Sequence, residues 1–271
     1  MKRFFAFGCS LTRYAYATWA DLAAANFDEY YNYAKGGGSN TLMMGRLIEA
    51  DNYFDFNKDT DTVYVMLSGI GRYSYYTYDR GWITNGDLYS YLSKNNNKDM
   101  EFLVKNIYND KGAIYQSWLA AHLMKKLLVS KGIPHKILYG INNSNYLVQN
   151  EFNDEESIRK VMDIESIVDI KTPFNDWFRC PENLRAGPVT PNYTDANTFD
   201  GHPSQLLHYK FLKNFLPEFD TEITNKLFTY VESIFDGRSQ HKQETTYRNK
   251  FYKKFNRAFT HPLFGQEHEL W

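Results

Sequence analysis

Residues 3–26 read RFFAFGCSLTRYAYATWADLAAAN and contain two different patterns in succession. Arg3 to Gly8 is a short apolar run typical of a buried strand, and Thr18 to Asn26 has the Ala- and Leu-rich composition of a helix. A strand joined by a loop to a helix is a building unit of α/β proteins. These residues therefore predict an α/β fold with a loop at the carboxyl end of its first strand.

The same alternation continues along the chain. The predicted strands are residues 30–34, 61–67 and 133–139, and the predicted helices are residues 41–50, 113–131 and 205–216. Strands that alternate with helices form a mainly parallel sheet with helices on both faces, which is a three-layer α/β/α sandwich. Ligands of such sheets bind at the carboxyl ends of the strands, so we expect the functional loops to meet there.

We expect one main domain over residues 1–217 and an extension over residues 218–271. The extension follows Pro217 and is rich in aromatic and basic residues, so we expect a helical or irregular structure for it. Residues 73–109 are rich in Tyr, Asn, Asp and Gly and predict an irregular insertion. Because this insertion follows the third strand, we expect it to form a lid or substrate wall over the carboxyl edge of the sheet.

Composition and charge narrow the class of protein. Hydrophobic residues make up 43% of the 271 residues and charged residues 23%, which is the balance of a folded domain. The formal net charge of -1 gives no overall attraction to nucleic acid or to an anionic membrane, so we expect neither partner. The apolar runs are far shorter than the ~20 residues of a membrane span and no signal peptide is recognised, which predicts a cytoplasmic or otherwise soluble protein. The oligomeric state stays open.

Cysteine and aromatic residues are less informative. Cys9 and Cys180 are expected to stay reduced, because the sequence shows no secretory signal. Aromatic residues make up 17% of the chain, with 22 tyrosines. This content suits a surface that stacks on sugars and equally suits an aromatic core, so composition does not choose between them.

Two short motifs carry the chemistry of a serine nucleophile. Ser10 follows the first strand directly after Gly8 and Cys9, in a tight turn that presents a hydroxyl. Asp200 and His202 lie together in a Gly- and Pro-containing loop before the last predicted helix. A serine becomes nucleophilic when an imidazole accepts its proton and a carboxylate orients that imidazole. The alternative interpretations are a serine that caps a turn and a histidine at the surface.

Three segments together resemble the SGNH (GDSL-like) hydrolase family, in the order that the family has them. They are residues 8–12 (GCSLT), residues 34–40 (AKGGGSN) and residues 200–204 (DGHPS). The resemblance implies a flavodoxin-like three-layer fold and a serine esterase-like mechanism without metal or cofactor. It implies that Ser10 is the nucleophile, that His202 is its base and that Asp200 orients His202.

The resemblance also implies an oxyanion site at the glycine loop, which is the segment of residues 34–40. Its donors would be the backbone N–H of Ser10 and that of Gly37, with Gly38 as the alternative. Asn40, which ends this segment, is included among the expected oxyanion or substrate-binding residues.

The sequence departs from the family pattern in two places. The family has Gly-x-Asn-Asp after the third strand, whereas residues 68–72 read SGIGR, so Ser68 or Arg72 is expected to replace the asparagine as donor. We expect Arg72 to point into the site beside Ser10, where it could alternatively bind an anionic part of the substrate. The family aspartate lies three residues before the histidine, where this chain has Phe199. Asp200 is therefore the expected partner of His202, and Asp195 is the reserve.

These features predict a serine-dependent esterase or acyl transferase that acts on a small-molecule or carbohydrate ester, such as an acetylated sugar. One alternative is a non-catalytic carbohydrate-binding or structural module on the same fold, because the third segment is altered. Another is a phosphate or nucleotide binder at the glycine loop, although residues 34–40 lack the P-loop and dinucleotide-binding spacings. The Cys and His residues lack zinc-site spacing, so we expect no metal.

Overall fold

The computed structural model describes residues 1–14, 16–79, 81–87, 101–102, 105–106, 108–141, 160–161, 163–180 and 202–234. Its central sheet has four parallel strands in the order β2-β1-β3-β6. These strands are β1 (Arg3–Phe7), β2 (Glu29–Asn32), β3 (Asp61–Leu67) and β6 (His135–Tyr139). When the strands of this sheet are numbered along the chain, the order is 2-1-3-4, which is the order of the first four strands of flavodoxin-like sheets. Ile170 adds an isolated parallel bridge to Leu138 at the β6 edge.

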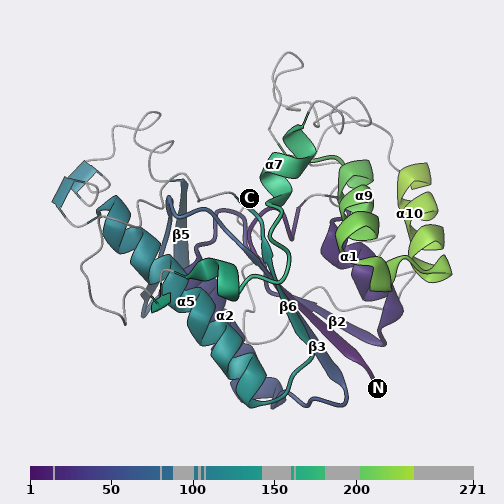
Figure 1. The fold of residues 1–271 in the computed structure, drawn as a ribbon, viewed down its shortest axis with the longest axis horizontal. Coiled ribbons are helices and arrows are strands. Elements are labelled where there is room, and N and C mark those ends of the chain that lie inside the picture. Colours follow the sequence, from purple (N-terminus) through teal and green to yellow (C-terminus); the bar gives the residue numbers. More distant parts are fainter. Residues whose placement is uncertain are drawn as a thin grey trace.

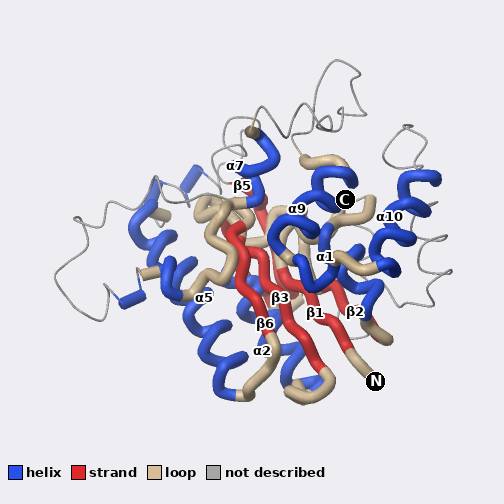
Figure 2. The backbone as a smooth tube through the Cα atoms, turned by 45° about the vertical axis from the view of Figure 1, so that its right-hand side comes forward, coloured by secondary structure: helices blue, strands red, loops and turns tan. Residues whose placement is uncertain are grey.

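Helices cover both faces of this sheet (Figure 1). One face carries α2 (Asn40–Phe54) and α5 (Asp110–Ser130), and the other carries α1 (Trp19–Ala23), α9 (Gln205–Phe215) and α10 (Glu222–Ile234). Figure 2, a rotated view, shows the same three layers, with the strands between the two helix groups. The predicted α/β sandwich with a mainly parallel sheet is therefore confirmed. The described residues also form α7 (Phe174–Arg179) and the 3-10 turns Ala24–Asn26, Ile164–Ser166 and Pro217–Phe219.

Strand β1 lies at the centre of the core because its side chains alternate between the two helical layers. Phe4 stacks on Phe27, with ring centroids 4.9 Å apart, and also contacts Phe219. Phe5 points the other way and contacts Phe54, with ring centroids 5.1 Å apart. All three phenylalanines of β1, which are Phe4, Phe5 and Phe7, are fully buried. Part of the high aromatic content therefore builds the core on both sides of the sheet.

An antiparallel hairpin follows β3, formed by β4 (Arg72–Thr77) and β5 (Gly81–Asp87). The prediction of an irregular insertion over residues 73–109 is therefore wrong for the part that the hairpin occupies. Tyr, Trp, Thr and Ile supply the strand propensity here, but no long apolar run marks the strands in the sequence. Residues 88–100 of the predicted insertion lie outside the described residues.

Helix α10 lies beyond the predicted domain boundary at residue 217. Its Leu227 and Val231 belong to the same hydrophobic core as the sheet. Phe228 stacks on Tyr209 of α9, with ring centroids 4.0 Å apart and an interplanar angle of 1°. The extension is thus helical over this segment and packs on the main domain. Residues 235–271 lie outside the described residues.

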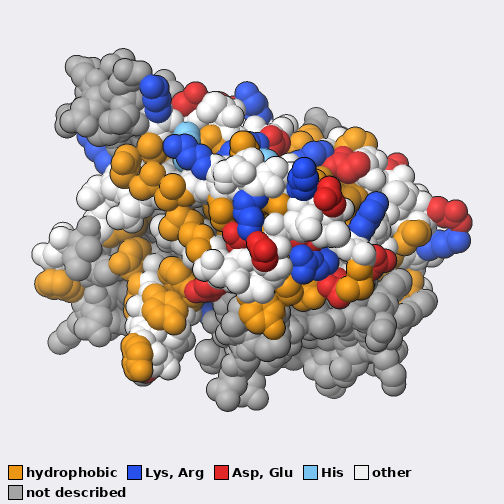
Figure 3. Space-filling model, turned by 90° about the horizontal axis from the view of Figure 1, so that it is seen from below, with side chains coloured by type: hydrophobic (Ala, Val, Ile, Leu, Met, Phe, Trp, Pro, Cys, Tyr) orange, Lys and Arg blue, Asp and Glu red, His pale blue; other side chains and the backbone are white. Residues whose placement is uncertain are grey.

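The surface carries charges of both signs. On the face shown in Figure 3, basic and acidic side chains of the described residues are interspersed rather than separated into patches. Within the described part of the chain, no helix combines the length and apolarity that crossing a bilayer requires. Cys9 is buried, Cys180 is exposed, and both are free thiols.

Candidate functional site

The candidate site lies where β1 and β3 end side by side at the carboxyl edge of the sheet. β1 pairs with β2 on one side and with β3 on the other, so the loops that follow β1 and β3 leave toward opposite faces. Crevices at such switch points are the ligand sites of open α/β sheets. The first loop turns sharply after β1, with the N–H groups of Thr12 and Arg13 donating to the Cys9 carbonyl at 3.0 and 3.2 Å. Ser10 lies in this turn with 6% of its surface exposed.

The glycine loop contacts the first loop through the backbone. The N–H of Lys35 donates to the Gly8 carbonyl at 3.1 Å, two residues before Ser10. Gly37 has a φ of +73°, a left-handed conformation that favours glycine over residues with a Cβ. The N–H of Gly38 donates within the loop, to the Lys35 carbonyl at 2.9 Å. Gly37 therefore remains the better oxyanion candidate of the two glycines.

Asn40 joins the glycine loop to the end of β3. Its Oδ1 accepts the N–H of Ser68 at 2.7 Å, and its Nδ2 donates to the Ser68 carbonyl at 3.2 Å. The same Nδ2 donates to the hydroxyl of Ser117 on α5 at 2.5 Å. Asn40 and Ser68 are both buried. Asn40 thus ties α2, β3 and α5 together, and the substrate contacts predicted for Asn40 and Ser68 stay predictions.

The first loop also lies against the segment that contains His202. The ring of Tyr14 stacks on His202, with centroids 4.2 Å apart, and the hydroxyl of Tyr16 donates to the Pro203 carbonyl at 2.6 Å. Within the described residues no hydrogen bond joins Ser10 to His202. Such bonds are often long in unliganded enzymes and shorten when substrate binds. Asp200 and its reserve Asp195 lie outside the described residues.

A buried polar network supports the first loop and was missed from the sequence. The Asp21 carboxylate accepts the Thr18 N–H at 2.8 Å and the Tyr30 hydroxyl at 3.0 Å. The Thr18 and Asn32 side chains both donate to the Thr12 carbonyl, at 2.7 and 3.1 Å. Burial raises the pKa of Asp21, and the hydrogen bonds from Thr18 and Tyr30 oppose this rise. The sequence does contain a signal for this network, which is a threonine three residues before an acidic residue at the start of a helix.

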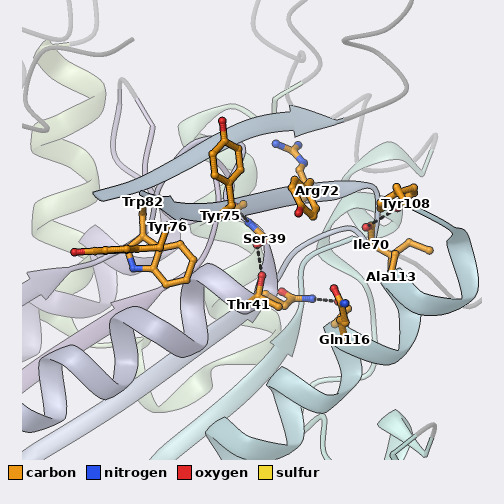
Figure 4. Close-up of a pocket in the computed structure, with 14 residues that line it drawn as sticks. Ser39, Thr41, Ile70, Arg72, Tyr75, Tyr76, Trp82, Tyr108, Ala113 and Gln116 are labelled. Atoms are coloured by element: carbon orange, nitrogen blue, oxygen red, sulfur yellow. Dashed lines mark hydrogen bonds between the residues drawn. The ribbon is translucent and has the colours of Figure 1, made fainter. Parts of the chain in front are cut away.

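A pocket of about 300 Å³ opens beside the glycine loop, between the β4–β5 hairpin, the start of α2 and the start of α5 (Figure 4). Its lining residues are Ser39, Asn40, Thr41, Ile70, Arg72, Tyr73, Ser74, Tyr75, Tyr76, Trp82, Tyr108, Ala113, Gln116 and Ser117. Asn40 and Arg72 are thus brought together at this pocket. Ser10, His202, Gly37, Gly38 and Ser68 do not line it. The prediction that Arg72 faces Ser10 stays a prediction.

The described residues contain no group of three or more His, Cys, Asp or Glu side chains arranged to hold a metal ion.

Comparisons with known proteins found similarity to solved structures. A GDSL-like lipase from Bacteroides thetaiotaomicron VPI-5482 has 14% sequence identity and a TM-score of 0.42, over 80% of this chain and 86% of that one. A proposed acylhydrolase from Bacteroides fragilis NCTC 9343 has 13% identity and a TM-score of 0.36, over 84% of this chain and 88% of that one. No protein-family model matches the sequence, and no curated protein matches it.

Proposed function

We propose that this protein is a serine-dependent esterase or acyl transferase of the SGNH type, acting on O-acyl groups of a carbohydrate. The observation that carries the proposal is the contact between the first loop and the segment of His202. Tyr14 stacks on His202 and the Tyr16 hydroxyl donates to the Pro203 carbonyl, so the loop that contains Ser10 lies against the segment that contains His202.

In this mechanism the Ser10 Oγ attacks the ester carbonyl carbon while the His202 imidazole accepts the hydroxyl proton. Asp200 holds the imidazole in orientation. The backbone N–H groups of Ser10 and Gly37 stabilise the oxyanion of the tetrahedral intermediate, with Ser68 or Arg72 as a further donor. The intermediate collapses to an acyl-serine, and His202 returns the proton to the leaving alcohol. Water then releases the acid, or an acceptor hydroxyl takes the acyl group.

Replacement of Ser10 tests the proposal. We expect Ser10→Ala to lower turnover of a generic acetyl ester at least ~10³-fold, because the nucleophile is lost. Its melting temperature should stay close to that of the parent, because the change removes a single oxygen atom and leaves no large cavity. Ser166→Ala, a serine outside the site, is the matched control and should keep full turnover.

Two outcomes would contradict the role of Ser10. Unchanged turnover in Ser10→Ala would remove this residue as nucleophile. A large fall in melting temperature with residual turnover would instead indicate that the hydroxyl stabilises the turn after β1.

A second candidate function is a carbohydrate-binding module on the same fold. The altered third segment favours it, because residues 68–72 lack the family asparagine, and loss of one oxyanion donor costs ~2.7–4 kcal/mol in a serine protease. Purified protein that binds oligosaccharides but turns over no acetyl ester would support this candidate over the enzyme.

A further inference from the structure

The pocket under the hairpin has an aromatic wall and a polar floor. Tyr76 and Trp82 come from the hairpin and form the wall, with ring centroids 5.6 Å apart, while Thr41 and Gln116 lie below them (Figure 4). Tyr76 is 62% exposed, so its ring is available to a ligand. Aromatic rings pack against the apolar faces of sugar rings, and hydroxyl and amide groups bind sugar hydroxyls.

Hydrogen bonds hold this pocket in place before any ligand arrives. The indole N–H of Trp82 donates to Glu49 Oε1 on α2 at 3.2 Å, and the Tyr108 hydroxyl donates to the Ile70 carbonyl at 3.1 Å. The N–H of Ser39 donates to Ser74 Oγ, which joins the glycine loop to the hairpin. Pre-formed walls lower the entropic cost of binding.

Arg72 gives the pocket its charge. Among the described residues that line the pocket it is the only charged one, and no carboxylate of the described residues forms an ion pair with it. A guanidinium presents a planar fork of donors that matches a carboxylate. A nucleotide ligand would bring two or more phosphate charges to this single cation. One cation beside several aromatic rings instead suits a ring that carries one negative charge.

We propose that this pocket binds an acidic sugar, a pyranose ring with a carboxylate group, within the glycan that carries the ester. The ring packs against Tyr76, its hydroxyls bind Thr41 and Gln116, and its carboxylate binds Arg72. Asn40 and Ser39 place the pocket directly beside the glycine loop, whose Lys35 bonds to Gly8. The inference rests on the proposed function only in taking the bound glycan as the substrate.

Calorimetric titration of the full-length Ser10→Ala protein tests the pocket without turnover. The probes are trigalacturonate and its methyl-esterified form, which have the same rings and differ in charge. We expect trigalacturonate to bind at least ~10-fold more tightly than its methyl-esterified form, as one charge-assisted interaction predicts. Arg72→Gln should remove this preference, and Arg72→Lys should weaken it several-fold despite the retained charge. Tyr76→Ala should weaken the binding of both probes.

Matched controls are Arg179→Gln and Tyr78→Ala, at positions outside the pocket lining, which should bind both probes as the Ser10→Ala parent does. Equal binding of acid and ester to the parent, no binding of either, or an Arg72→Gln protein that melts normally and keeps the preference would overturn the proposal. Tighter binding of adenosine diphosphate than of trigalacturonate would overturn it in favour of a nucleotide. Ester turnover by the unmodified protein is a separate measurement, so failure of the pocket and failure of the esterase are distinguishable.

Discussion

His208 is a second histidine close to the candidate base. It lies on α9 with 1% of its surface exposed and packs edge-on against Phe174, with ring centroids 4.9 Å apart. Burial lowers the pKa of His208 to about 3, and the neighbouring His202 adds to this effect. The imidazole is therefore neutral in the folded protein, whereas in the unfolded chain it has an ordinary pKa of about 6.5.

This difference predicts an acid-dependent loss of stability. Below pH ~6.5 the unfolded chain binds a proton at His208 that the folded protein does not bind. The free energy of unfolding therefore decreases as pH falls from ~6.5 toward 3. We expect His208→Leu to show a shallower fall in melting temperature than the parent between pH 6.5 and 4. The difference between the two proteins should be constant above pH 7.5, where His208 is neutral in both states. If the plots of melting temperature against pH are parallel for the two proteins over the whole range, the prediction is wrong.

The elements of the central sheet could be predicted from the sequence because each leaves a local pattern. The apolar run of Arg3–Phe7 and the run of Asp61–Leu67 were both placed within one residue of the observed strands. The hairpin was missed because its strands put tyrosines toward solvent and pocket rather than into a continuous apolar face. α10 was predicted only as part of an extension, because its packing on α9 depends on residues distant in the sequence.

The site was less predictable than the fold. The order of elements placed the loops of Ser10, Gly37 and Ser68 at one edge of the sheet, since carboxyl ends of parallel strands meet there. The contacts of Tyr14 and Tyr16 with the His202 segment form only on folding, and no local pattern marks them. Single tyrosines in a chain with 22 of them carry little information before the structure is known.

The hairpin is held on α2 by a close contact at Gly45. A Cβ built at Gly45 would lie 2.3 Å from Cζ2 of Trp82, so alanine does not fit without displacing the indole. In an isolated helix, alanine is favoured over glycine by about 1 kcal/mol. We expect Gly45→Ala to be destabilising by about 1–3 kcal/mol all the same, because overpacking outweighs the helix propensity. Chemical denaturation measures this change.

A double-mutant cycle with Trp82→Ala isolates the contact. When the indole is absent, Gly45→Ala should become neutral or stabilising, since only the helix propensity remains. If Gly45→Ala is equally destabilising with and without Trp82, the clash is not its cause.

At the scale of the whole molecule, the core extends across both faces of the sheet and past the predicted boundary at residue 217. Phe219 contacts Phe4 of the central strand, and Thr221 donates to Asn26 Oδ1 at 2.7 Å. The segment after Pro217 therefore closes the layer that α1 and α9 begin. We infer that residues 218–234 unfold together with the sheet rather than as an independent unit.

Two substitutions on α10 test this cooperativity. Leu227 is 2% exposed and Ile223 is 54% exposed on the same helix. We expect Leu227→Ala to lower the free energy of unfolding by about 2–5 kcal/mol, as buried leucines do. Ile223→Ala, the matched control, should change it by less than ~0.5 kcal/mol. The whole protein should melt in one transition that shifts downward in Leu227→Ala, measured by both near-ultraviolet circular dichroism and calorimetry. An independent extension would instead give a separate transition that moves, while the main transition of the sheet stays at the parent temperature.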